Sequence, residues 1–480
     1  MSSSDKKHRA NLQSHLFALT LDRQARPALH LQLAQALRGL ILSGTATPGA
    51  RLPASRTLAA ELSISRMTVQ TAFDQLLAEG YLTARRGAGT FVASDLPDLS
   101  GPAATPDPGP KLPAPPPFQP FRPGVPDMAA FPHRLWSRLL ERAWARPDPA
   151  LLGEGDPLGW PPLRAAIAAH LQAWRGIACH PRQVVVTSGA VEAFELVLDS
   201  CVPPAAGVLI EDPGYDPLRR VLTRTGRRPV PCRIDGDGLD ISTAPDGLAA
   251  AIVTPSRHYP TGATLPLARR LALLDWANRT GAPVIEDDYD GEFRYRGQPL
   301  PALASLDRTG QVFYLGSFSK LLSPGLRLGY LVVPGRHLPA LAAQMAARGS
   351  SASLTPQPAL AAFMQDGAFA SHLRRMRRLY GRRQQHLLAI LRRAPDLLQV
   401  SEDPGGMHLT CPLGPALVGR VQDTEIAQAG TDHGLHLRAL SAYSVLPDPP
   451  QGLVLGFAAY DEAALTAAAT RLLTILHALR

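Results

Sequence analysis

Short apolar runs recur between residues 184 and 315 of the chain, and longer amphipathic stretches separate them. Runs rich in valine and isoleucine are typical of strands buried on both faces of a parallel sheet, and amphipathic stretches are typical of the helices that cover it. The pattern predicts an α/β fold with a mainly parallel sheet and helices on both faces. The predicted strands are 184–187, 208–211, 251–254, 284–287 and 312–315.

The last third of the chain has a different pattern. A long helical stretch rich in arginine runs through residues 373–383, and strand-like pieces follow at 406–410 and 434–438. They predict a smaller α/β part, about 346–480, after a large part at about 155–345. A run of arginines on a helix is typical of a solvated or partner-facing surface, and a second DNA-facing surface is the alternative.

Residues 1–93 have the apolar spacing of a small separate domain. Leu33, Leu37 and Ile41 fall on one face of a helix, and two short helical stretches follow at 55–62 and 65–79. Residues 80–92, with glycines near the middle, predict a hairpin. This order predicts a winged helix-turn-helix, mainly α with a β wing, although any small three-helix domain can show the helical pattern.

Charge favours DNA binding by this domain. Up to residue 94 the chain has eleven Lys and Arg against five Asp and Glu, a net charge of +6 out of +9 for the whole chain. Ser65, Arg66 and Thr68 open the second short helix, where backbone amides and short side chains can meet a phosphate or enter the major groove. Arg85 and Arg86 in the predicted wing can reach the DNA backbone or the minor groove.

Residues 94–120 form a predicted linker because proline recurs every few positions among small residues. Such a segment cannot build a core and is expected to be a semi-rigid spacer of up to about 80 Å, at about 3.1 Å per residue. The expected domain plan is therefore a DNA-binding domain at 1–93, a linker at 94–120 and a second module at 121–480.

Cysteines and apolar runs indicate the expected compartment. The four cysteines, Cys179, Cys201, Cys232 and Cys411, are scattered without a C-x-x-C pair, which argues against a zinc site or any other metal centre. The polar N-terminus lacks the apolar core of a signal peptide, and no run approaches the ~20 apolar residues that span a bilayer. We expect a soluble cytoplasmic protein.

Lys320 is the most informative single residue. The only other lysines are Lys6, Lys7 and Lys111, which lie in polar or proline-rich segments. Arginine has replaced lysine elsewhere, but a guanidinium cannot react as an amine with a carbonyl, so the remaining lysine marks a place where a nucleophilic amine is needed. An isolated lysine at a strand end can also simply reach solvent.

The neighbours of Lys320 favour the chemical interpretation. Asp287 ends a predicted strand, at the edge where open α/β sheets bind ligands, and a buried carboxylate there needs a cation such as a protonated pyridine. Arg327 suits a phosphate. Residues 188–190 follow a strand and open a helix, an arrangement that binds phosphate and is also common in ordinary turns. Together these residues indicate a pocket for pyridoxal 5′-phosphate (PLP).

At this point the chain resembles a known family. From about residue 121 it resembles the fold-type I aminotransferase domain of MocR-type members of the GntR regulator family, including those that respond to PLP and control pyridoxine synthesis. Residues 26–92 resemble the family's winged helix. The motifs that carry the resemblance are Thr187-Ser188-Gly189-Ala190, Glu211-Asp212-Pro213-Gly214-Tyr215, residues 254–262, Glu286-Asp287-Asp288-Tyr289 and Gly316-Ser317-Phe318-Ser319-Lys320.

The resemblance implies a role for individual residues. Lys320 forms the Schiff base, Asp287 holds the pyridinium, Tyr215 stacks on the ring and Tyr289 bonds the phenolic oxygen. The implied phosphate region consists of Ser188, Gly189, Ala190, Ser317, Ser319 and Arg327. The implied DNA contacts are Arg56, Arg66, Thr68, Arg86 and Gly87, next to Ser65.

Four positions depart from the family pattern. Tyr259 stands where aminotransferases usually have an asparagine, and Arg257-His258 replaces a common His-Gln pair. Val454 stands where many aminotransferases have the arginine that binds a substrate α-carboxylate. Recognition of an ordinary amino acid then requires a replacement, such as Arg438 or Arg257.

Three functions follow as alternatives. The leading hypothesis is a homodimeric transcriptional regulator that binds an operator and senses PLP or a PLP-amine adduct, with little or no turnover. The second is an active aminotransferase with an accessory DNA-binding domain. The third is a constitutive DNA-binding protein whose PLP fold only dimerises. Related regulators answer to PLP itself or to amino compounds such as γ-aminobutyrate or taurine, and Val454 favours PLP.

Overall fold

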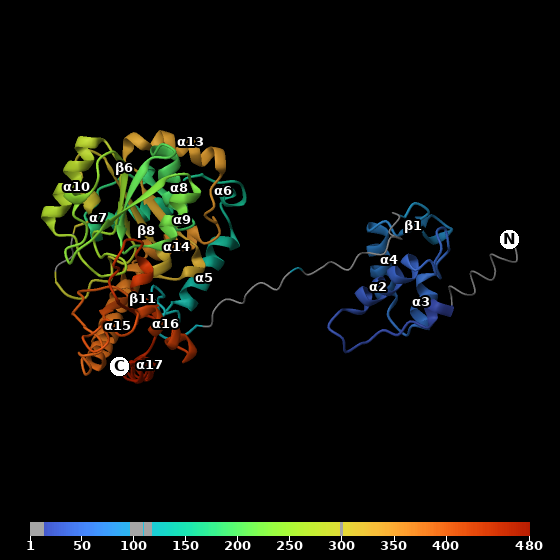
Figure 1. Cartoon of the computed structure of the whole chain (residues 1–480). Coiled ribbons are helices and arrows are strands. Elements are labelled where there is room, and N and C mark those ends of the chain that lie inside the picture. Colours follow the sequence, from blue (N-terminus) through green and yellow to red (C-terminus); the bar gives the residue numbers. More distant parts are fainter. Residues whose placement is uncertain (1–13, 97–108, 110–117, 298–300) are drawn as a thin grey trace. The chain divides into compact units, whose positions relative to one another are not determined.

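A computed structural model describes residues 14–96, 109, 118–297 and 301–480 of the chain. The chain divides into two units, Met1–Pro115 and Pro116–Arg480, which we describe separately (Figure 1). Most of the predicted linker, 94–120, lies outside the described residues, as do Lys6, Lys7 and Lys111. No helix among the described residues is long and apolar enough to cross a membrane.

The N-terminal unit consists of helices around one apolar core and a two-stranded wing. The helices are α2 (Leu29–Leu42), α3 (Ser55–Glu61) and α4 (Arg66–Ala78), and the wing pairs β1 (Leu82–Arg85) antiparallel with β2 (Gly89–Val92). Each helix contributes buried side chains to the core, among them Leu37, Leu58 and Phe73. The predicted winged helix-turn-helix is confirmed.

Three local features shape the face that α4 and the wing present. Ser63 has a φ of 52°, in the left-handed region, so the chain reverses direction within a few residues between α3 and α4. Ser65 then caps α4, because its hydroxyl accepts a hydrogen bond from the Thr68 amide at 3.0 Å. Gly87, in the wing turn, has a φ of 76°, which glycine adopts without strain.

A seven-stranded sheet organises the C-terminal unit, in the order β3-β9-β8-β7-β6-β4-β5. All neighbours pair in parallel except β9, which runs antiparallel to both β8 and β3. The mainly parallel sheet predicted from the apolar runs is therefore confirmed. The strands are β3 (Val184–Thr187), β4 (Gly207–Asp212), β5 (Arg228–Arg233), β6 (Leu248–Val253), β7 (Val284–Asp288), β8 (Val312–Ser317) and β9 (Gly329–Val332).

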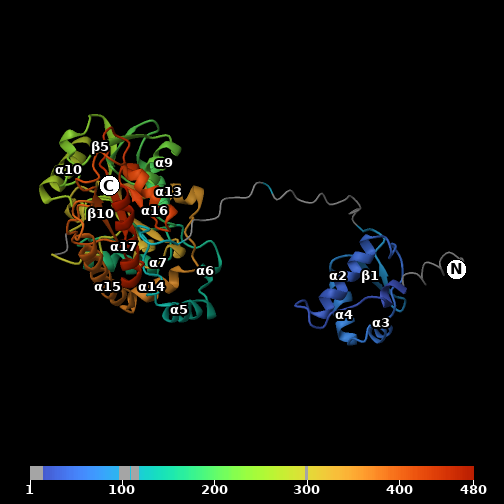
Figure 2. The same ribbon diagram turned by 60° about the horizontal axis from the view of Figure 1, so that its bottom comes forward.

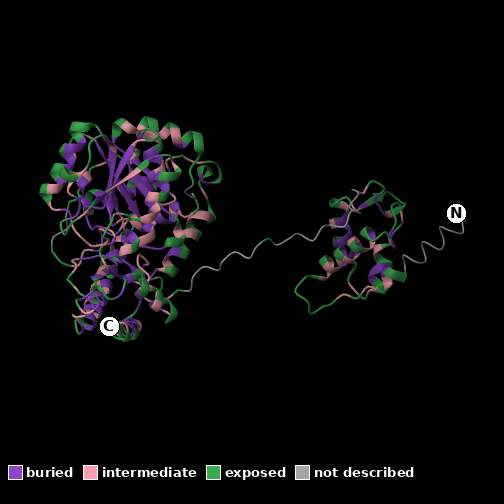
Figure 3. Ribbon diagram, viewed as in Figure 1, coloured by how far each residue is buried: buried purple, intermediate pink, exposed green. Residues whose placement is uncertain are grey.

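Helices cover both faces of this sheet, and its strands are buried between them (Figures 1 and 3). In β7, Ile285 points to the face packed by α8 (Ala190–Cys201), α9 (Asp216–Arg224) and α13 (Leu338–Arg348). Val284 points to the other face, which α10 (Leu267–Thr280) covers. The alternation follows from the two-residue period of a strand. Near β3 and β9 this second face packs against α7 (Pro161–Arg175) and α14 (Gln357–Gln365).

The smaller part has a three-stranded antiparallel sheet, in the order β10-β12-β11. Its strands are β10 (His408–Pro412), β11 (Arg438–Ala439) and β12 (Gly452–Gly456). Three helices accompany it, α15 (Ala368–Leu391), α16 (Asp423–Asp432) and α17 (Glu462–Ala478) (Figure 2). The remaining helices of the unit are α5 (His133–Ala145), α6 (Pro149–Leu152), α11 (Leu303–Leu306) and α12 (Phe318–Leu321).

The strand predictions differ from the structure in two ways. The predicted strand at 434–438 shrinks to Arg438–Ala439, because the preceding residues turn out of the sheet after α16. The strands β5 and β9 were not predicted. β5 is an edge strand with two prolines and arginine at both ends, so it lacks the apolar run of a central strand.

Candidate functional site

A cavity of about 100 Å³ lies at the carboxyl edge of the seven-stranded sheet. Parallel strands end at the same edge, so residues that follow different strands converge there. Of the residues predicted to bind a cofactor, Ala190, Tyr215, Asp287, Tyr289, Ser317 and Lys320 line this one cavity. Pro123, Gly124, Thr254 and Tyr259 complete its lining.

Lys320 stands in α12, directly after β8, with its amine inside the cavity. Its Nζ donates one hydrogen bond, to the carbonyl oxygen of Gly124 at 2.9 Å, and it forms no ion pair with any residue in the described parts of the chain. Burial lowers the pKa of Lys320, against the opposing charges of Asp287 and Asp290. A lower pKa leaves more of the amine neutral and able to attack a carbonyl.

The backbone conformation of Gly124 and its closeness to this amine both favour glycine at this position. Its φ of 71° lies in the left-handed region, and a Cβ on this residue would come within 2.9 Å of Lys320 Nζ. Sequence reasoning missed Gly124, because a glycine between Pro123 and Val125 gives no local sign of a partner 196 residues away. Only the folded chain shows that the segment before α5 closes one side of the cavity.

Asp287 is a buried acidic residue that lines the cavity. Its carboxylate is 8 % exposed, and Oδ1 has no hydrogen-bond partner within the described part of the structure. Burial, and then the nearby carboxylate of Asp288, raise the pKa of Asp287 to about 7, while Lys320 lowers it. Burying an unpaired carboxylate is costly, so the site suits a ligand with a positively charged N–H, such as a pyridinium.

The predicted phosphate residues are brought together only in part. Gly189 precedes α8 with a φ of 140°, a backbone conformation that other residues rarely adopt, and Ala190 at the helix start lines the cavity with Ser317. Amides in the first turn of a helix have no partner within the helix and can face an anion. Ser188 directly precedes this turn, and its amide donates to Glu192 at 2.6 Å.

Ser319 and Arg327 do not line the cavity. Ser319 is half-buried beside Lys320 in α12. Arg327 is exposed and follows the turn at 324–326 with a φ of 50°. Their assignment to the phosphate region therefore rests on the family resemblance.

Three tyrosines form the aromatic wall of the cavity. Tyr259 meets Tyr215 and Tyr289 edge-on, with ring centroids 6.0 Å and 5.6 Å away. Tyr215 is 36 % exposed and lines the cavity, and an aromatic ring in that position suits stacking on a planar ligand. The hydroxyl of Tyr289 accepts a hydrogen bond from Arg257 at 2.9 Å. Tyr259 thus stands at the centre of the wall.

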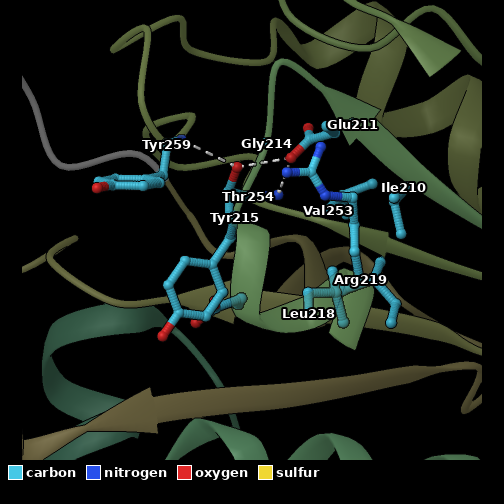
Figure 4. A pocket seen from close by; sticks show the side chains of 11 residues that line it. Ile210, Glu211, Gly214, Tyr215, Leu218, Arg219, Val253, Thr254 and Tyr259 are labelled. Atoms are coloured by element: carbon cyan, nitrogen blue, oxygen red, sulfur yellow. Dashed lines mark hydrogen bonds between the residues drawn. The ribbon is translucent and has the colours of Figure 1, made fainter. Parts of the chain in front are cut away.

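A hydrogen-bonded chain behind this wall fixes Tyr259 (Figure 4). The amide of Tyr259 donates to the hydroxyl of Thr254 at 3.3 Å, and that hydroxyl donates to Glu211 at 2.7 Å. Burial raises the pKa of Glu211 to about 7, partly offset by its hydrogen bonds from Thr254. The carboxyl group therefore acts as a buried anchor for the loop that carries Tyr259.

Arg257 is committed to structural partners. Its guanidinium donates to Asp403 through Nε at 3.1 Å and Nη2 at 2.5 Å, and Nη1 lies 3.2 Å from Asp290. The side chain is buried. Two carboxylates and the Tyr289 hydroxyl take up its donors, so Arg257 does not offer a free site for a ligand carboxylate.

The predicted DNA-contacting residues share the exposed surface of the N-terminal unit. Arg56, Arg66 and Arg86 are exposed, and none pairs with an acidic residue in the described part of the chain. Gly87 is also exposed. The hydroxyl oxygens of Ser65 and Thr68 are hydrogen-bonded at 2.8 Å. These two residues therefore stabilise the start of α4 and also lie at its surface. The neighbouring Met67 is 72 % exposed.

Comparison with known families agrees with both units. Residues 29–92 match the bacterial regulatory proteins of the gntR family, and residues 139–472 match the aminotransferase class I and II family. The second match covers the seven-stranded sheet and most of the smaller part. The chain therefore combines a gntR-family domain with an aminotransferase-family domain.

Individual proteins show the same combination. The chain is 38 % identical to the probable rhizopine catabolism regulatory protein MocR of Rhizobium meliloti, with 92 % of each chain covered. It is 37 % identical to the pyridoxine biosynthesis transcriptional regulator PdxR of Corynebacterium glutamicum, over 90 % of this chain and 92 % of that protein. A kynurenine aminotransferase of Pyrococcus horikoshii, crystallised with PMP, has a TM-score of 0.68 at 22 % identity over 75 % of this chain and 90 % of its own.

Proposed function

This chain belongs to the MocR-type regulators of the GntR family, and we propose that it senses PLP, free or as a PLP-amine adduct, and thereby modulates transcription. The observation that carries this proposal is the meeting in one cavity of a half-buried amine, Lys320, and a buried carboxylate, Asp287, one oxygen of which has no hydrogen-bond partner among the described residues. The fold of the second unit is that of aminotransferases, which supports PLP as the ligand.

The residues of the cavity suit each part of PLP. Lys320 would bind its aldehyde carbon covalently, and Asp287 would pair with the pyridine nitrogen. Tyr215 would stack on the ring, Tyr289 would face the phenolic oxygen, and the start of α8 would receive the phosphate with help from Ser188, Ser317, Ser319 and Arg327. When bound, PLP supplies an aldehyde that captures amines reversibly.

The N-terminal unit would bind double-stranded operator DNA. Arg56, Arg66 and Arg86 are exposed, so they can reach phosphates or base edges without first breaking an ion pair. Ser65, Thr68 and Gly87 would contact the backbone close to them. We expect the chain to act as a homodimer, which would present two such units to an operator with two half-sites.

Little or no transamination follows from the same cavity. Arg257 is committed to Asp403 and Asp290, and Val454 is an apolar side chain that is fully buried. Neither Arg257 nor Val454 therefore supplies the carboxylate-binding arginine that the resemblance requires of an active enzyme. Incubation with PLP, an amino donor and a keto acid is expected to yield no product over many turnovers.

Chemical trapping tests the proposal. The purified protein is incubated with PLP and treated with borohydride, and its peptides are mapped by mass spectrometry. We expect one stable pyridoxyl group, on the peptide that contains Lys320, and none in Lys320→Ala. The Lys111 peptide serves as an internal control for non-specific labelling. Labelling spread over several lysines, or equal labelling of both proteins, would contradict the proposal.

A further inference from the structure

Arg257 joins the large and smaller parts of the C-terminal unit beside the cavity. It lies in the loop that follows β6, in the large part, and is 7 % exposed. Its Nε and Nη2 donate to the carboxylate of Asp403, and Nη2 also donates to the carbonyl oxygen of His408 at 2.8 Å. Both acceptors belong to the smaller part. Nη1 turns to the residues that follow β7, where it donates to the hydroxyl of Tyr289 at 2.9 Å and to Asp290 at 3.2 Å.

These contacts use every donor of the guanidinium. Nε carries one N–H and each terminal nitrogen carries two, which makes five donors in a fixed plane. The contacts with Asp403, His408, Tyr289 and Asp290 account for all five. A guanidinium with all its donors engaged cannot turn without breaking several charge-assisted hydrogen bonds together. Arg257 therefore has a fixed orientation, with Nη1 held against the Tyr289 hydroxyl.

Two glycines leave room for the ion pair between Arg257 and Asp403. Gly406, in the smaller part, has a φ of 82°, and a Cβ on this residue would overlap Cζ of Arg257. Gly262, in the loop that carries Arg257, has a φ of 81°, and a Cβ there would come within 2.6 Å of the Asp403 carboxylate. Glycine allows both the left-handed backbone and the close approach. The backbone is thus adapted to the ion pair on both of its sides.

The contact with Arg257 determines the role that is left for the Tyr289 hydroxyl. A phenol has one proton to donate, and its oxygen can accept hydrogen bonds as well. The oxygen accepts from Arg257, and no residue in the described part of the chain accepts the proton. Tyr289 lines the cavity together with Lys320. Its hydroxyl is therefore a donor toward the cavity, and the charge of Arg257 strengthens that donor.

We propose that Arg257 is a positioning residue that directs the Tyr289 hydroxyl to the phenolic oxygen of PLP and strengthens its hydrogen bond there. The inference rests on the proposed function, because PLP must be bound at Lys320. The other charged groups that face Tyr289 are Asp290 and Asp403, and both form ion pairs with Arg257. Histidine is common at this position in the family, so a permanent positive charge behind Tyr289 is a departure of this chain.

The visible spectrum of bound PLP reports on this hydrogen bond. A donor at the phenolic oxygen stabilises its negative charge, so loss of the donor raises the pH at the midpoint of the spectral change. The full-length protein loaded with PLP is titrated as wild type, Arg257→Gln, Tyr289→Phe and the double variant. We expect each single substitution to raise the midpoint by about one pH unit, a tenfold change in proton affinity. The double variant should match Tyr289→Phe, because Arg257 acts through the hydroxyl that phenylalanine lacks.

Two further variants distinguish this role from a structural one. Arg227→Gln removes another buried arginine, which pairs with Asp199 at 2.7 Å and does not line the cavity. It should lower the melting temperature and leave the spectral midpoint unchanged. Arg257→His introduces the residue that is common in the family, so we expect it to fold. It should also raise the midpoint, because a neutral imidazole places no charge behind Tyr289.

A ligand without the phenolic oxygen provides a second readout. The probe is 3-deoxypyridoxal 5′-phosphate, which keeps the aldehyde, the ring nitrogen and the phosphate of PLP. Arg257→Gln should weaken the binding of PLP about tenfold and change the affinity for the probe less than about twofold. Equilibrium dialysis measures both affinities in the wild-type protein and the variant.

The outcomes separate this inference from the proposed function. If the wild-type protein does not retain PLP on Lys320, the proposed function fails and this inference fails with it. If PLP is retained but Arg257→Gln leaves the midpoint unchanged, the positioning role alone is wrong. The role is also wrong if Arg257→Gln shifts the midpoint equally with and without the Tyr289 hydroxyl, or weakens PLP and the probe to the same extent.

Discussion

The DNA-facing surface of the N-terminal unit and the Lys320 cavity of the C-terminal unit both present charged groups without partners, but under opposite conditions. Arg56, Arg66 and Arg86 are exposed and hydrated, so leaving them unpaired costs the fold almost nothing. Asp287 is buried with an oxygen that lacks a partner in the described structure, so its charge destabilises the ligand-free protein. Substitutions on the DNA-facing surface should therefore change DNA binding without changing the stability of the fold. Substitutions in the cavity should change both ligand binding and stability.

The largest effect is expected from Asp287→Asn. The amide keeps the size of the side chain but removes the charge that would pair with the pyridinium of PLP. We expect the affinity for PLP to fall about a hundredfold, in line with the roughly 3 kcal/mol lost when one partner of a buried ion pair is removed. Equilibrium dialysis at pH 8 measures the change. An unchanged affinity would remove Asp287 from the cofactor site.

The same variant is expected to change the pH dependence of stability. The pKa of Asp287 is raised from 3.8 to about 7 in the folded protein, so its stabilising protonated form is fully populated at low pH and is lost as the pH rises through 7. Asparagine stays neutral. The ligand-free variant should therefore gain in free energy of unfolding over wild type between pH 5 and 8, by roughly 2–4 kcal/mol. Urea titrations at several pH values test this, and a constant difference would contradict it.

On the DNA-facing surface, Arg66→Ala should weaken binding without changing stability. Loss of one arginine contact to DNA costs about 1–3 kcal/mol, or roughly ten- to a hundredfold in affinity. Arg38→Ala is the matched control, because Arg38 pairs with Glu79 at the opposite end of α4. Binding to DNA upstream of the gene is measured at one salt concentration, with melting temperatures alongside. Equal affinities for both variants would place the DNA contacts elsewhere.

The smallest effect on stability and DNA binding is expected at Ser65, which caps α4 and lies next to the predicted DNA contacts. Its hydroxyl caps α4, so Ser65→Ala is expected to cost about 1 kcal/mol of stability. Ser65→Asp keeps an acceptor for the Thr68 amide but places a negative charge beside the DNA. Ser65→Asp should have the melting temperature of the wild type. Its affinity for DNA should be much lower than that of Ser65→Ala. If both variants bind DNA equally well, Ser65 is only a helix cap.

The sequence allowed much of this to be predicted where the evidence was local. Strands such as β3 and β8 contain apolar runs, and the carboxyl ends of β7 and β8 placed Asp287 and Lys320 at one edge. Lys320 stood out because the chain otherwise uses arginine. The partners of Arg257 could not be predicted in the same way, since its bond to Asp403 joins residues 146 positions apart.

Two further features depended on contacts that the sequence does not display. Gly124 matters because its backbone meets Lys320, and Arg438, which the sequence offered as a candidate carboxylate ligand, is placed directly opposite Val454 only by the pairing of β11 with β12. Both follow from how the smaller part and the segment before α5 pack against the large sheet. Apolar periodicity identifies elements, but it does not specify which of their ends meet.

The most direct test of the account is the coupling between the two sites. DNA affinity is measured at one fixed salt concentration for the wild-type protein and Lys320→Ala, each with and without PLP, because phosphate contacts make affinity depend on salt. A ligand alters DNA affinity only if it favours one state of the protein over another. We expect PLP to change the affinity of the wild type and not that of Lys320→Ala. Equal affinity of the wild-type protein in both forms would contradict PLP as the signal.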